Sequence, residues 1–230
     1  MPLGVFVDCA AVFLGGLIGA LAGKGLKERT HAYLTVVFGF CAMAIGINSI
    51  VKVSAMTPVI LSIVVGCLLG DLLQVEECIQ ALAEAALNRL PRQGETDMDQ
   101  LLTVIVLFCF SGFGIYGVFL SSMSGDHTLL LSKAVLDCFT ALVFAITVGL
   151  PVMLVSLPMM GVMLLLFSLG KVIAPLMSDA MLRDFMACGG ILTLVTGLRV
   201  AGIKKTPIAN MIPALVLVLP LSWLWSLLPF

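Results

Sequence analysis

Two charged side chains stand inside one apolar stretch of this 230-residue chain. The stretch LLLSKAVLDCFTALVFAITVG, residues 129–149, places Lys133 and Asp137 four residues apart, on one face of a helix. A lysine near a helix end can extend its ammonium to a membrane surface, whereas an aspartate one turn deeper cannot reach water. Two hypotheses follow. The pair neutralises itself and is only structural, or Asp137 faces an internal cavity and binds a cation or a proton beside Lys133.

Small residues in the stretch VLFCFSGFGIYG form the second candidate site. Ser111, Gly112 and Gly114 lie in the middle of an apolar run, where they make a continuous helix unfavourable. One interpretation is close packing, because small residues let helices approach each other in lipid. The other is a helix break whose N–H and C=O groups contact a bound ion or solute. Both interpretations stay open at this point.

Asn210 and Asp8 are further polar residues inside apolar runs. Asn210 lies in PIANMIPAL, between Pro207 and Pro213, which can leave backbone carbonyls free for ligands. Its amide can donate and accept hydrogen bonds, so we expect it to orient a bound ion or solute. Asp8, near the end of the first apolar run, is expected to touch water.

The composition shows which solvent surrounds these residues. Hydrophobic residues make up 61% of the chain, charged residues 11%, and the mean hydropathy is +1.20. Soluble domains are far more polar, and a net charge of −1 predicts no nucleic-acid partner. The seven cysteines show no zinc-type spacing, so we expect no metal site and no cofactor.

The apolar runs predict an all-α integral membrane protein in a lipid bilayer, because each is about as long as a membrane-crossing helix. Only Pro151 and Pro158 separate the fifth run from the sixth, so seven spans with one long kinked helix are the alternative. The eight predicted spans are 3–23, 32–51, 57–74, 101–121, 129–150, 152–173, 184–202 and 207–228.

The basic residues predict the orientation. Eight lie in loops on one side of the spans and four at or near the other side, which by the positive-inside rule places both termini in the periplasm of a bacterial inner membrane. The polar segment 75–100 then lies on the cytoplasmic side as an amphipathic helix followed by a linker. A docking site for a soluble partner is the alternative for this segment.

Two parts of the chain resemble each other. Residues 39–58 align with 190–207 after a two-residue gap, with glycines at matching places, and Gly19 falls on Gly170 at the same offset. Spans one to three thus match spans six to eight, in opposite directions, as in transporters with inverted repeats. The predicted units are a first repeat at 1–74, the segment 75–100, central helices at 101–150 and a second repeat at 152–230.

Four segments carry a family resemblance: VLFCFSGFGIYG, SGDHTLLLSKAVLDCFTALVFA, CGGILTLVTGLRVAGIK and PIANMIPAL. In their order and spacing they resemble the YqgA/YdfK family of bacterial inner-membrane proteins, over essentially the whole chain. The resemblance implies a polytopic inner-membrane protein. It implies no substrate and no catalytic residue.

These features favour a transporter or channel for a small ion or small solute, with cation or proton coupling as an option. The alternative is a membrane scaffold or regulator that acts through 75–100. We expect no enzyme, because HExxH is missing and His31 and His127 lie near span ends on opposite sides. Glycine-rich helix faces predict a homodimer or larger homo-oligomer.

Overall fold

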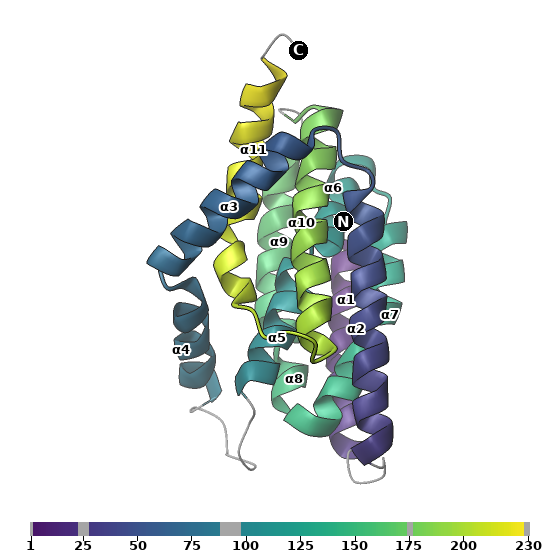
Figure 1. The fold of residues 1–230 in the computed structure, drawn as a ribbon. Coiled ribbons are helices and arrows are strands. Elements are labelled where there is room, and N and C mark those ends of the chain that lie inside the picture. Colours follow the sequence, from purple (N-terminus) through teal and green to yellow (C-terminus); the bar gives the residue numbers. More distant parts are fainter. Residues whose placement is uncertain (1, 23–27, 88–97, 174–176, 228–230) are drawn as a thin grey trace.

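The computed structural model describes residues 2–22, 28–87, 98–173 and 177–227, and within these ranges every regular element is helical (Figure 1). The helices are α1 Leu3–Ala22, α2 Glu28–Ile50, α3 Met56–Leu72, α4 Val75–Leu87, α5 Met98–Phe110, α6 Gly112–Ser124, α7 Thr128–Val148, α8 Pro151–Leu154, α9 Ser156–Ile173, α10 Asp179–Val200, the 3-10 turn η2 Ile208–Met211 and α11 Pro213–Ser226.

Six segments in the described ranges are long and apolar enough to cross a membrane, and they correspond to six of the eight predicted spans. The other two predicted spans differ. The run 57–74 forms α3, which has 17 residues and meets α4 at a 53° bend. The run 101–121 is divided between α5 and α6.

The fifth and sixth predicted spans are two separate helices and not one long kinked helix. α7 ends at Val148, and Gly149 follows with φ +82°, a conformation that side chains with a Cβ rarely adopt. α8 and α9 then run back along the bundle, and both α7 and the α8–α9 segment qualify separately as candidate spans (Figure 1).

The predicted amphipathic helix is confirmed over Val75–Leu87, which is α4. Gln74 separates it from α3 with a left-handed φ of 51°, so the chain changes direction within two residues. Residues 88–97 of the predicted linker lie outside the described part of the chain. In Figure 1, α3 and α4 lie beside the main bundle on the side of α11.

Close glycine contacts set the relative directions of the helices. Gly15 and Gly19 of α1 lie against the backbones of Cys138 and Leu142 of α7, so these two helices run parallel. Gly66 and Gly70 of α3 lie against Ala214 and Asn210, so α3 and α11 run antiparallel. The glycines of GGLIGALAG and GCLLG therefore pack helices against each other within the chain.

The α2–α10 pair is held by reciprocal contacts between glycines. A Cβ added at Gly39 would lie 2.8 Å from the carbonyl oxygen of Gly197, and one at Gly197 would lie 2.6 Å from that of Gly39. Gly46 and Gly190 show the same relation, at 2.6 and 2.8 Å. The two helices are thus antiparallel and touch along their backbones.

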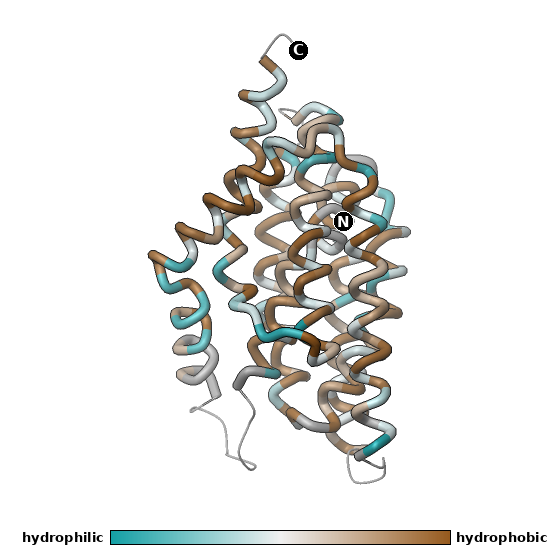
Figure 2. The backbone as a smooth tube through the Cα atoms, viewed as in Figure 1, coloured by the Kyte–Doolittle hydropathy of each residue, from teal (hydrophilic) through white to brown (hydrophobic). Residues whose placement is uncertain are grey.

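The helices that face the viewer in Figure 2 consist mostly of hydrophobic residues. Polar colour gathers in α4 and in the turn after α10 (Figure 2). Large exposed apolar side chains occur on many helices, among them Phe6, Leu14, Ile60, Leu68 and Val216. Such a surface suits lipid and does not suit water.

The α2–α10 contact leads to a stability prediction. Gly46→Ala places a methyl group 2.6 Å from the carbonyl oxygen of Gly190, and overpacking of this kind costs about 1–3 kcal/mol. We therefore expect a lower midpoint of thermal unfolding in detergent micelles. Gly161→Ala in α9 is the control, because no described atom outside its own helical turns lies within 4 Å of its added Cβ. Equal midpoints for the two variants would contradict the close α2–α10 contact.

Candidate functional site

The centre of the candidate site is one ammonium between two carboxylates. Lys133 Nζ lies 3.0 Å from Asp8 Oδ2 and also donates to Asp137 Oδ2. The exposed fractions of Asp8, Lys133 and Asp137 are 0%, 2% and 5%. We call these three residues the trio. The pair Lys133–Asp137 was predicted from its spacing, and the third member was not.

The parallel packing of α1 on α7 brings Asp8 to Lys133. An added Cβ at Gly4 would lie 2.9 Å from Leu130, and one at Gly15 would lie 2.2 Å from the carbonyl oxygen of Cys138. Asp8 lies between these two contact points on α1, opposite Lys133. The expectation that Asp8 touches water is therefore wrong, because the glycines bring α1 so close to α7 that its carboxylate is enclosed.

The side chain of Lys133 lies against Gly114, just after the break between α5 and α6. Ser111 has extended backbone angles (φ −67°, ψ 131°), and its Oγ accepts a hydrogen bond from Gly114 N at 3.2 Å. The α6 helix begins at Gly112 as a result. A Cβ at Gly114 would lie 2.6 Å from Lys133 Cε, so the lysine stem rests on this glycine and does not extend to the membrane surface. The structure thus has the break at Ser111 and Gly112, and Gly114, which follows it, lies against Lys133 of the trio.

The trio carries more negative than positive charge. With all three groups ionised it holds one excess negative charge, and Asp8 Oδ1 is buried with no hydrogen-bond partner among the described residues. A buried carboxylate oxygen without a donor costs free energy. The arrangement therefore favours the arrival of a positive charge.

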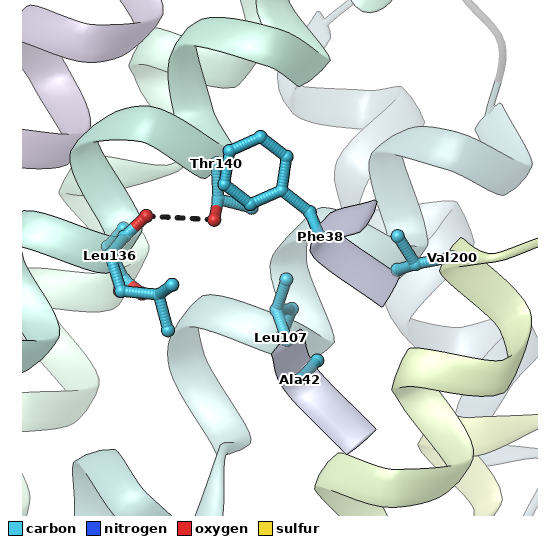
Figure 3. Close-up of a pocket in the computed structure, with 7 residues that line it drawn as sticks. Phe38, Ala42, Leu107, Leu136, Thr140 and Val200 are labelled. Carbon is cyan, nitrogen blue, oxygen red and sulfur yellow. Dashed lines mark hydrogen bonds between the residues drawn. The ribbon is translucent and has the colours of Figure 1, made fainter. Parts of the chain in front are cut away.

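A small cavity adjoins Asp137. Its volume is about 20 Å³, which is room for about one water molecule. Asp137 and Thr140 are the polar residues of its wall, and Thr140 Oγ1 donates to the Leu136 carbonyl at 2.8 Å (Figure 3). The remaining wall is apolar and comes from α2, α5, α7 and α10: Phe38, Ala42, Leu107, Leu136 and Val200.

Asn210 does not join the trio. It lies in η2, and its Oδ1 accepts a hydrogen bond from Glu76 N at 2.9 Å, so it caps the start of α4. Figure 1 places α4 and the lower end of α11 on the other side of the bundle from α7. The predicted role of Asn210 beside Asp137 has no support in this geometry.

Glu76 and Arg199 complete this second cluster. Arg199 Nη1 lies 3.0 Å from Glu76 Oε1, and Glu76 Oε2 accepts from Ala209 N at 3.1 Å. Glu76 is therefore half-buried, whereas the neighbouring Glu77 is exposed. These bonds attach the start of α4 to α10 and η2.

Asp184 is a buried acid that the sequence interpretation missed. Its Oδ1 accepts from Ser54 N and Ala55 N at 2.9 and 2.8 Å, and Ser222 Oγ donates to its Oδ2 at 2.6 Å. It thus caps the start of α3 and joins it to α11. Its position at the start of the apolar run 184–202 was the available signal. Both of its oxygens have donors, so its role is structural.

Comparison with known proteins agrees with the resemblance in the sequence. A family model described as a protein of unknown function, DUF554, matches residues 3–223. The uncharacterized protein YqgA of Escherichia coli (strain K12) is 38% identical over 231 residues and 98% of each chain. The uncharacterized membrane protein YdfK of Bacillus subtilis (strain 168) is 28% identical over 218 residues and 93% of each chain. No solved structure matches the chain.

The trio leads to a second stability prediction. Lys133→Met leaves two buried carboxylates without their cation, and breaking a buried ion pair from one side costs about 3–5 kcal/mol. We expect a marked fall in the thermal unfolding midpoint in detergent micelles. The matched control combines Lys133→Met with Asp8→Asn and Asp137→Asn, removes all three charges, and should regain much of the loss. A single variant as stable as the wild type would show that the ammonium does not hold the carboxylates.

Proposed function

The chain belongs to the DUF554 family of proteins of unknown function, and we propose that it is a membrane transporter or channel for a small ion or small solute, coupled to a cation or a proton. The observation that carries the proposal is the trio of Asp8, Lys133 and Asp137. Ionisable groups deep in a membrane bundle are costly, and in transport proteins they mark ion and proton pathways.

The excess negative charge of the trio favours an ion-binding site over a purely structural ion pair. One lysine and one aspartate would suffice to join α1 to α7 and would leave no net charge. The third group adds a buried negative charge and an oxygen that has no hydrogen-bond partner in the described part of the chain. The extra negative charge is explained if the site binds a cation during the transport cycle.

The helix break next to the trio supports the same proposal. Interrupted helices inside a membrane bundle place backbone N–H and C=O groups at the depth where solutes bind. Ser111, Gly112 and Gly114 form this break, and Lys133 lies against it. We propose that the backbone here contacts the transported solute.

The contacts between α2 and α10 support an inverted repeat. The offset that aligns Gly39 with Gly190 also aligns Gly46 with Gly197. When each glycine is replaced by the one aligned with it, the Gly39–Gly197 contact becomes the Gly190–Gly46 contact, which is also present. The same offset further matches neighbours: Gly39 meets Ala201 while Gly190 meets Ile50, and Gly46 meets Leu194 while Gly197 meets Met43. Contacts related in this way are expected of two halves with opposite orientation, the arrangement behind many carriers.

We further propose eight crossings in a bacterial inner membrane, with both termini in the periplasm. α3 and the α5–α6 pair count as crossings, which agrees with the parallel α1–α7 pair and the antiparallel α2–α10 and α3–α11 pairs. The proposal treats the chain as a transport protein and not an enzyme. The homo-oligomer was predicted from glycine-rich helix faces. Four of these glycines pack against helices of the same chain and so do not support it: Gly15, Gly19, Gly66 and Gly70.

The scaffold alternative has one observation in its favour. The start of α4 is bonded to α10 and η2 through Glu76, so a partner on α4 could act on the bundle. If 75–100 is the working part, replacing the exposed charges of α4 abolishes function while the trio is dispensable.

Transport is tested by flux in proteoliposomes. A panel of small cations, anions and organic acids is offered to the wild type, with and without a pH gradient. We expect flux of at least one solute, and a fall of tenfold or more in Asp137→Asn, because that variant removes one carboxylate of the trio. Glu77→Gln is the control, since Glu77 is an exposed acid on α4.

Each outcome has a distinct meaning. Flux that survives Asp137→Asn would keep transport and remove the trio from the pathway. The absence of flux for all solutes, from protein whose folding has been verified, would overturn the transport proposal in favour of the scaffold.

A further inference from the structure

Resting on the proposed transport function, we propose that the coupling ion is a proton, bound by the carboxylates of Asp8 and Asp137 and exchanged with water through the cavity beside Asp137. The charges, the available ligands and the size of the cavity carry this inference. Lys133 remains an ammonium throughout.

The charge balance calls for one positive charge. Two carboxylates and one ammonium leave the buried site at −1, and one bound proton makes it neutral. The burial of all three residues makes that neutral state favourable, because an unbalanced charge in a low-dielectric bundle is costly.

The ligands available do not suit a metal cation. Sodium-like and larger cations need several oxygen ligands, whereas a proton needs one. Asp8 Oδ2 and Asp137 Oδ2 are already bonded to Lys133 Nζ, and Asp8 Oδ1 is the buried side-chain oxygen of the trio that has no hydrogen-bond partner among the described residues. Within the described residues no group of three His, Cys, Asp or Glu side chains could hold a metal ion.

The cavity fits water and little else. The cavity of about 20 Å³ has room for about one water molecule. Apart from Asp137 and Thr140, its wall is apolar. A hydrated metal ion would be too large, whereas a single water can deliver a proton to Asp137. The cavity lies where α2, α5, α7 and α10 meet, at residues contributed by both members of the antiparallel α2–α10 pair.

Among the side chains that the structure describes, few other titratable groups face the trio. Cys9 of α1 and Cys109 of α5 are near enough to interact electrostatically with it. α2 contributes Phe38 and Ala42, α6 contributes the backbone at Gly114, and α8 has no titratable residue. The thiols carry no charge to balance, so the two carboxylates are the groups that can take the proton.

The binding step balances in atoms and charge. A hydronium ion in the cavity gives its proton to an Asp137 carboxylate oxygen, an O–H bond forms there, and the O–H bond in hydronium breaks to leave water. The site passes from −1 to neutral, and release is the reverse. Through their shared ammonium, Asp8 and Asp137 act as one site for one proton.

The test is infrared spectroscopy of the whole protein in lipid nanodiscs across a pH series. A protonated carboxyl group has a carbonyl stretch that vanishes when the group ionises. We expect the wild type to show such a band, titrating with pH and unchanged when potassium is replaced by sodium. Asp8→Asn should lose it, because Lys133 and Asp137 then form a neutral pair that needs no proton. Glu77→Gln, which removes an exposed acid, should keep the band.

Asp8→Asn is the preferred variant because it keeps Lys133 paired and is expected to fold; Asp137→Asn is the second variant and should also lose the band. A wild type without a titrating band, or a band that sodium removes, would overturn the proton proposal. The proposed transport function fails separately: flux without a band would retain transport with another ion, and a band without flux would retain the proton site in a protein that does not transport.

Discussion

The close approach of α1 to α7 is the constraint on which the candidate site depends. Glycines at Gly4, Gly15 and Gly19 allow the backbones to touch, and this contact encloses Asp8 with Lys133. Once the ammonium is enclosed, it needs a carboxylate as its counter-charge, because a buried lysine without one would be far more costly. Its stem then needs space, which Gly114 provides at the break between α5 and α6. Packing, charge and the helix break are thus parts of one arrangement.

The rest of the bundle follows from the bilayer as solvent. Lipid supplies no hydrophobic force between helices, so association depends on close packing and on satisfied polar groups. Close packing is seen where α2 and α10 touch through four glycines. The second, satisfied polar groups, is seen at Asp184, which accepts from the N–H groups just before α3, and at Asn210, which accepts from an N–H group in the first turn of α4. Asp184 thus attaches α3 and Asn210 attaches α4, the two helices that lie beside the main bundle.

Some of this could be predicted from the sequence. Hydropathy alone predicts the helical membrane class, and six of the eight predicted spans are long apolar helices. The i,i+4 spacing predicts the pairing of Lys133 with Asp137, and the Ser-Gly-Phe-Gly composition singles out the break. These are local features, determined by residues within one or two helical turns.

The rest depends on contacts between distant parts of the chain. Asp8 and Lys133 are 125 residues apart, and their contact depends on the register of two parallel helices. Asn210 looked like a ligand residue because it lies between prolines, yet its partner is the N–H of Glu76, 134 residues away. A cap of this kind has no local pattern. The ion pair of Glu76 has no local pattern either, because its partner Arg199 belongs to another helix.

The central claim is that the trio exchanges an ion with water from within the membrane. Charge displacement after a pH jump tests this most directly, on proteoliposomes adsorbed to a solid-supported membrane and without any added solute. The account predicts a brief current in the wild type, as protons reach the buried carboxylates, and its loss in Asp8→Asn. A current of equal size in that variant, or none from correctly folded wild type, would contradict the account and leave the trio as a structural clasp between α1 and α7.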